Sequence, residues 1–86
     1  MSFKWNTYAG GTFAAPDKHG YSARTNLGTY DIQPVSFSSG KHRGYRLHFI
    51  NDKGKLAGGL YQEIGMFRSP NAAKSASIKH YNKHLK

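Results

Sequence analysis

A serine followed by a proline, at positions 69 and 70, divides this sequence into two parts of different periodicity. The Ser69 hydroxyl can accept a hydrogen bond from a free backbone amide, and Pro70 has no amide hydrogen to leave unsatisfied at the first helical position. After this pair, apolar side chains recur at helical spacing opposite a row of lysines. We therefore predict an amphipathic helix over residues 69–86, with its apolar side against the rest of the protein.

The segment before the serine, residues 27–67, follows a period of two, which is typical of β-strands. The clearest strand is predicted at residues 45–50. Tyr45, Leu47 and Phe49 would face one side of a sheet there, and the side chains between them would face the other. This parity predicts which residues of the strand remain outside the core.

Prolines and glycines predict interruptions of the neighbouring strands. The apolar side chains change sides at Pro34, which favours a bulge or a break in an edge strand. A polar turn that contains Gly54 predicts a tight hairpin, and residues 56–67 would form the returning strand, in which glycines favour a bulge. Its parity predicts two opposite faces, one with Leu56, Leu60, Ile64 and Met66 and the other with Tyr61, Glu63 and Phe67.

Residues 1–26 show neither period. They contain turn-forming glycines and several large aromatic side chains without regular spacing. Exposed rings of this size would make an apolar patch, so we expect this irregular arm to pack on the rest of the domain, with a short strand at residues 3–8. The aromatic residues concerned are Phe3, Trp5, Tyr8, Phe13 and Tyr21.

These patterns together predict one α+β domain in residues 1–86. A three-stranded or four-stranded antiparallel sheet would carry the C-terminal helix on one face. The domain would consist of an irregular arm at residues 1–26, the strands at 27–67 and the helix at 69–86. With 86 residues, the chain has room for one hydrophobic core.

Composition excludes several kinds of site. The chain has no cysteine, so it has no disulfide framework, no thiolate metal site and no cysteine nucleophile. His80 and His84 are four residues apart on the predicted helix, but no third ligand accompanies them, and we predict no metal and no cofactor. No apolar run approaches the length that spans a bilayer, so we expect a soluble cytoplasmic protein without membrane contact.

Positive charge dominates the second half of the chain. The net charge is +9, and it divides into +1 for residues 1–40 and +8 for residues 41–86. Lysine and arginine in such excess favour a polyanionic partner, because neutralised phosphates release their counterions and opposite charges steer association. The alternative is that the charge only keeps a small protein dissolved.

The run of residues 42–85 resembles a family of DNA-binding domains. It has a basic and aromatic strand at 44–49 and a charged turn at 52–55, followed by a glycine, an aromatic residue, a helix cap and paired alanines in 64–74. This order is similar to the pattern of plant ethylene-response factors and of the arm-binding domains of phage tyrosine recombinases. The resemblance implies a three-stranded sheet whose face opposite the helix reads the DNA major groove through arginine and other polar side chains.

We therefore predict a small, non-catalytic protein that binds nucleic acid, DNA or RNA, through the outer sheet face and its adjoining loops. Arg46 and His48 would lie on that face, and Tyr61 could stack on a base. Pairing of Arg46 with Glu63 is the alternative to a ligand contact. The predicted binding residues are Lys41, Arg43, Arg46, His48, Lys53, Lys55, Tyr61 and Arg68, and the predicted secondary basic face on the helix consists of Lys79, Lys83 and Lys86.

Two other functions fit the same sequence. A short, aromatic-rich chain without cysteine is typical of phage-encoded inhibitors of host defence, such as anti-CRISPR proteins, and would bind an acidic protein or a ribonucleoprotein surface. A metal-independent ribonuclease, as among small basic bacterial toxins, would need an acid, a base and cations around a phosphate. The sequence leaves the oligomeric state open. The candidate residues for the ribonuclease are Glu63, His48, Arg46 and Tyr61.

Overall fold

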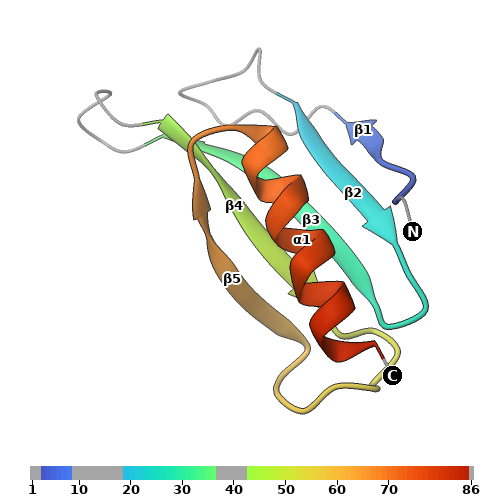
Figure 1. Cartoon of the computed structure of the whole chain (residues 1–86). Helices are drawn as coiled ribbons and strands as arrows, with labels where there is room; N and C mark the ends of the chain where they lie inside the picture. Colours follow the sequence, from blue (N-terminus) through green and yellow to red (C-terminus); the bar gives the residue numbers. More distant parts are fainter. Residues whose placement is uncertain (1–2, 9–18, 37–42, 86) are drawn as a thin grey trace.

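The computed structural model describes residues 3–8, 19–36 and 43–85. These residues form a five-stranded antiparallel sheet and one C-terminal helix that lies across one face of the sheet (Figure 1). Neighbours in the sheet are also neighbours in the chain, in the order β1-β2-β3-β4-β5. The α+β class is therefore confirmed, but the sheet has five strands where three or four were predicted. The elements are β1 (Asn6–Tyr8), β2 (Gly20–Arg24), β3 (Thr29–Ser36), β4 (Arg43–Ile50), β5 (Tyr61–Phe67) and α1 (Pro70–His84).

The two additional strands, β1 and β2, come from residues 1–26, which were predicted to be an irregular arm with a short strand at residues 3–8. β1 lies within that short strand and confirms it, whereas β2 was not predicted. β1 is only three residues long, which is too short for an alternating pattern to be visible. The inward positions of β2 hold Tyr21 and the small Ala23, so this strand has a weak apolar signal. β2 is held by its pairing with β3, and β1 is held in turn by β2. Pairing, rather than local pattern, extends the sheet.

Pro34 lies inside β3, the middle strand, and the register with β4 continues through it without a shift. The predictions of a bulge or a strand break and of an edge strand at this proline are therefore wrong. Pro34 pairs with Tyr45 of β4, whereas the pairing of β3 with β2 ends at Ile32. One side of β3 therefore carries no ladder pair at the proline. A residue without an amide hydrogen is tolerated in such a position.

The connection between β4 and β5, residues 51–60, is longer than the predicted tight hairpin, and β5 begins at Tyr61 rather than Leu56. The Asn51 side chain holds this loop, because its Nδ2 donates a hydrogen bond to the Leu56 carbonyl oxygen at 2.7 Å. The Asn51 backbone amide donates to the Leu60 carbonyl oxygen at 2.7 Å. Leu56 packs against the core, so the loop closes one end of the core instead of extending the strand.

A β-bulge in β5 changes the faces predicted for that strand. Leu47 of β4 pairs with Gly65 of β5, and His48 pairs with Glu63. Ile64, between these two residues of β5, therefore has no partner on β4. The alternation shifts by one residue at this point. Ile64 and Phe67 pack against the core, whereas Met66 is exposed. The prediction that Ile64 and Met66 share a face is therefore wrong.

The C-terminal helix α1 follows its prediction. The Ser69 Oγ accepts a hydrogen bond from the backbone amide of Ala72 at 3.2 Å, and Pro70 is the first helical residue. Mostly small side chains on the inward side let the helix approach the strands closely. The buried residues of this side are Ala73, Ser77 and Tyr81.

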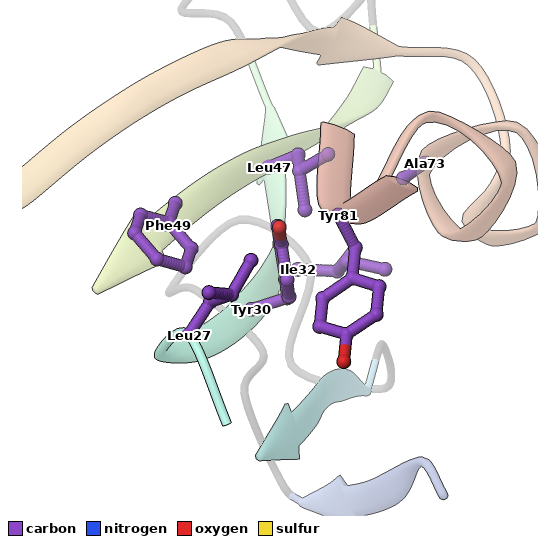
Figure 2. Packing of buried hydrophobic residues seen from close by; sticks show 7 residues of the cluster. All are labelled: Leu27, Tyr30, Ile32, Leu47, Phe49, Ala73 and Tyr81. Atoms are coloured by element: carbon purple, nitrogen blue, oxygen red, sulfur yellow. The ribbon is translucent and has the colours of Figure 1, made fainter. Parts of the chain in front are cut away.

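The core lies between α1 and the inward face of the sheet. Phe3 packs from the N-terminal segment against Tyr30 and Tyr81, with ring-centroid distances of 5.4 and 5.3 Å. Trp5 lies beside Phe3, so the prediction that the aromatic arm packs on the domain is confirmed for these two rings. Phe13 lies outside the described residues. The buried cluster consists of Leu27, Tyr30, Ile32, Leu47, Phe49, Ala73 and Tyr81 (Figure 2).

Candidate nucleic-acid interface

We name the face of the sheet that points away from α1 the outer face. Residues directly opposite each other in antiparallel strands point to the same side, so the register arranges the outward side chains in rows across the strands. Within residues 3–8, 19–36 and 43–85, no second layer covers these rows (Figure 1). The three central rows are Tyr61-Ile50-Thr29, Glu63-His48-Asp31 and Met66-Arg46-Gln33.

Arg46 lies on the outer face as predicted, and it is paired with Glu63. Arg46 Nε is 3.0 Å from Glu63 Oε1, although the N–H direction is not that of a well-aligned hydrogen bond. The two side chains are 40% and 60% exposed. This is the only ion pair among the described residues. A guanidinium has five N–H donors, so the pair leaves others for a second anion.

His48 occupies the middle of the central row. Its cross-strand partner on β3 is Asp31, and its partner on β5 is Glu63. The imidazole is half-buried, and in the part of the chain that the structure describes it forms no ion pair with either carboxylate. Together with Arg46, four ionisable side chains meet at the centre of the outer face.

Tyr8 fixes one side of that group, although the sequence predicted only a packing role for it. Its hydroxyl donates a hydrogen bond to Asp31 Oδ1 at 2.5 Å, and its ring lies so close to the Gly20 backbone that a Cβ at position 20 would clash with it. Burial, and then Asp31, raise the pKa of Tyr8 well above its ordinary range, so the hydroxyl remains a donor. Tyr8 and Asp31 are 23 residues apart, and only the strand register brings them together. No local signal in the sequence could have identified this pair.

Tyr61 is the most exposed of the large apolar and aromatic side chains described, at 70%. It begins the edge strand β5 and pairs across the sheet with Ile50. Met66, near the other end of the same strand, is also exposed on the outer face. The Tyr61 ring is therefore exposed on the outer face, and its stacking on a base stays a prediction.

The predicted basic residues that the structure describes lie at opposite ends of the outer face. Lys53 and Lys55 are exposed in the loop after β4, whereas Arg43 begins that strand, and the exposed Arg68 follows β5 at the same end as Arg43. β4 has eight residues, so its two ends are about 24 Å apart. These positions flank the outer face and do not converge on one point. Lys41 lies outside the described residues.

The predicted secondary basic face lies on the other side of the molecule. Lys79 and Lys83 are exposed on α1, away from the sheet, and Lys86 lies outside the described residues. Lys74 of the same helix is different, because its Nζ lies 4.4 Å from the centroid of the Tyr21 ring. A ligand on the outer face would not reach the lysines of the helix.

The two helix histidines make structural contacts. His80 Nδ1 is 2.7 Å from the Tyr30 hydroxyl oxygen, and the ring centroids of His80 and His84 are 4.5 Å apart. Among the described residues, no three metal-binding side chains gather as a metal site would require. Burial, and then His84 and Lys83, lower the pKa of His80. The neutral imidazole is therefore favoured at this position, beside the core residues Tyr30 and Phe49.

No protein-family model matches the chain, and neither a curated protein nor a solved structure matches it. The resemblance to ethylene-response factors remains an expectation from the sequence. The fold defines the class of the protein, which is an α+β domain with a five-stranded antiparallel sheet followed by one helix. The helix in the described part of the chain is not long and apolar enough to cross a membrane.

Proposed function

We propose that this protein binds nucleic acid through the outer face. The observation that supports this most strongly is that one open sheet surface carries both an exposed tyrosine and an outward arginine. Proteins bind single-stranded nucleic acids mainly by stacking bases on aromatic side chains and by attracting phosphates to basic ones. Tyr61 would supply the stacking surface, and Arg46 would supply a phosphate contact at the centre of the face.

The charge balance supports an anionic ligand. The carboxylates on the outer face have partners within the protein, because Glu63 is paired with Arg46 and Asp31 accepts a hydrogen bond from Tyr8. These contacts reduce the repulsion that the carboxylates would exert on a phosphate. The chain as a whole has a net charge of +9, which favours association with a polyanion.

The width of the sheet favours single strands over a duplex. Five strands with a spacing of about 4.8 Å span about 19 Å, whereas the major groove of DNA is about 12 Å wide and admits a helix or a two-stranded ribbon. β1 and β2 thus widen the surface beyond the three strands that the resemblance implies. Unpaired bases can spread over a broad sheet and stack on its side chains. We therefore propose single-stranded RNA or DNA as the ligand.

Fluorescence anisotropy with labelled single-stranded and duplex oligonucleotides, at two salt concentrations, tests this proposal. We expect the protein to bind single strands at low salt, with an affinity that decreases steeply as salt increases. Tyr61→Ala should weaken binding by about 5-fold to 150-fold, because stacking contributes about 1–3 kcal/mol per base. Leu85→Ala removes another exposed apolar side chain, at the end of α1, and should leave the affinity unchanged.

A pair of charge-matched variants locates the binding surface. Arg46→Ala removes one positive charge from the outer face, and Lys79→Ala removes one from the far side of α1. We expect the larger loss of affinity for Arg46→Ala. Equal losses in the two variants, or no binding at low salt, would contradict the proposal. Binding to an acidic protein without affinity for nucleic acid is the outcome that the inhibitor alternative predicts.

A further inference from the structure

Four ionisable side chains meet at the centre of the outer face. Asp31 of β3, a cross-strand partner of His48, accepts a hydrogen bond from Tyr8, and the other three come from β4 and β5. Glu63 of β5 and His48 of β4 are direct cross-strand partners, and Arg46 is the next outward residue along β4. Arg46 Nε lies 3.0 Å from Glu63 Oε1. The Cβ atoms of direct cross-strand partners are about 5 Å apart. A phosphate group resting on this part of the sheet would therefore meet a carboxylate, an imidazole and a guanidinium together.

These are the kinds of group that cleavage of RNA without a metal requires. A carboxylate can accept the proton of an attacking hydroxyl, and an imidazolium can donate a proton to a leaving oxygen. A guanidinium can stabilise the negative charge that develops on the phosphate. All three side chains project from adjacent strands of one sheet, which holds them more firmly than a loop would. Tyr61, two residues before Glu63 and 70% exposed, is placed to stack on a neighbouring base.

We propose that the outer face cleaves single-stranded RNA by internal transesterification. Glu63 removes the proton from a ribose 2′-hydroxyl, and the 2′-oxygen forms a bond to the adjacent phosphorus. The bond between the phosphorus and the 5′-oxygen breaks while protonated His48 donates its proton to that oxygen. Arg46 stabilises the additional negative charge on the phosphate during the transfer. The products are a cyclic 2′,3′-phosphate end and a 5′-hydroxyl end.

The reaction balances without a further reactant. The proton that Glu63 gains equals the one that His48 loses, and exchange with solvent restores both groups. The inference rests on the proposed function, because RNA must first bind to the outer face. It also goes beyond that function, because the attacking 2′-hydroxyl is present in RNA and absent from DNA. Single-stranded DNA should therefore be bound and left intact.

Incubation of the full chain with a fluorescein-labelled single-stranded RNA in EDTA, followed by a denaturing gel, tests the inference. We expect cleavage, with cyclic phosphate ends identified by mass spectrometry. Glu63→Gln and His48→Gln should each lower the rate by about 10²-fold to 10⁴-fold, while single-stranded DNA of the same sequence remains bound. Ser75→Ala lies on the exposed side of α1 and, prepared in the same way, should cleave at the parent rate. A copurifying ribonuclease would cleave equally in all of these preparations, whereas the inference predicts a loss only in Glu63→Gln and His48→Gln.

The pH dependence separates acid and base roles from a structural role. The cleavage rate of the parent should rise and then fall with pH, because the base must be deprotonated and the acid protonated. The residual rate of Glu63→Gln should lack the rise at low pH. RNA that is bound but not cleaved, or cleavage that persists in both variants, would overturn the inference and leave the proposed function intact. Failure to bind any single strand would overturn both.

Discussion

The two faces of the sheet are formed by alternate residues of the same strands and have opposite properties. Phe49 points towards α1 and is fully buried, whereas its neighbour His48 points to the outer face, between Asp31 and Glu63. The inward face requires the helix, because its rings would otherwise be exposed to water. The outer face carries side chains that interact across strands, and no second layer covers them within the described residues. In a domain with two layers, one face of the sheet can therefore supply stability while the other is left for a ligand.

The polar contacts of the two faces also differ in their exposure to water. The buried Tyr81 hydroxyl donates a hydrogen bond to Asn26 Oδ1, and a buried hydroxyl without a partner would destabilise the fold. The Arg46–Glu63 pair on the outer face is partly exposed, so water can replace either partner. We therefore expect stability to depend strongly on the inward contacts and weakly on the outward ones.

Substitution of two neighbouring residues should give the largest difference between the faces. Phe49→Ala should lower the free energy of unfolding by about 3–5 kcal/mol, because it leaves a cavity in the core. His48→Ala should change it by less than about 0.5 kcal/mol, because this side chain lies on the outer face. Urea denaturation followed by circular dichroism measures both values. Similar losses in the two variants would mean that the outer face also belongs to the core.

The elements that could be predicted from the sequence are those with local signals. The alternation of β4 and the cap of α1 depend on residues close together in the chain, and both predictions are confirmed. The short strand predicted at residues 3–8 is confirmed by β1, but its place in the sheet and the whole of β2 could not be predicted, because both depend on pairing with a strand elsewhere in the chain. The strand break predicted at Pro34 was wrong for a related reason. A proline is tolerated in a central strand where the neighbouring strand has ended, and the end of the pairing with β2 is not visible in the local sequence.

The residues of the candidate site also divide into those with a local signal in the sequence and those brought together only by strand pairing. The outward position of Arg46 and His48 could be predicted, because alternation along one strand determines which side each residue takes. The pairing of Arg46 with Glu63 stayed an open alternative, because the register of β5 depends on the bulge at Ile64. Asp31 could not be predicted as a neighbour of His48, because it comes from β3 through the register alone.

Removal of one tyrosine hydroxyl from each face should give the next largest difference. Tyr81→Phe should lower the free energy of unfolding by about 1 kcal/mol, because it removes the partly buried hydrogen bond that Tyr81 donates to Asn26. Tyr61→Phe should have almost no effect, because that hydroxyl belongs to a side chain that is 70% exposed. Paired thermal and urea denaturation curves measure the two changes. An equal loss in Tyr61→Phe would contradict the assignment of stability to the inward face.

Acidification should destabilise the inward face through His80. Burial, and then His84 and Lys83, lower the pKa of His80 below its ordinary value of 6.5, so the folded protein disfavours the charged ring. The contribution of neutral His80 to the free energy of unfolding is therefore fully present above pH 6.5, and it decreases as the pH falls through the lowered pKa. Protonation would also prevent Nδ1 from accepting a hydrogen bond from Tyr30.

Melting temperatures across this pH range, measured by circular dichroism, check the expectation. The melting temperature of the parent should decrease on acidification. His80→Asn retains a polar group near Tyr30 but does not titrate, so its melting temperature should depend less on pH. If the variant were as sensitive as the parent, other groups would be responsible.

The Arg46–Glu63 pair should make the smallest contribution to stability. A double-mutant cycle with Arg46→Ala, Glu63→Ala and both together should give a coupling of about 0.2–1 kcal/mol, because the side chains are 40% and 60% exposed. Added salt should reduce the coupling further. A coupling well above this range would mean that the pair behaves as a buried one and that the outer face is closed to water. A weak pair has a functional consequence, since a phosphate could then take the place of Glu63 beside Arg46 with little loss of stability.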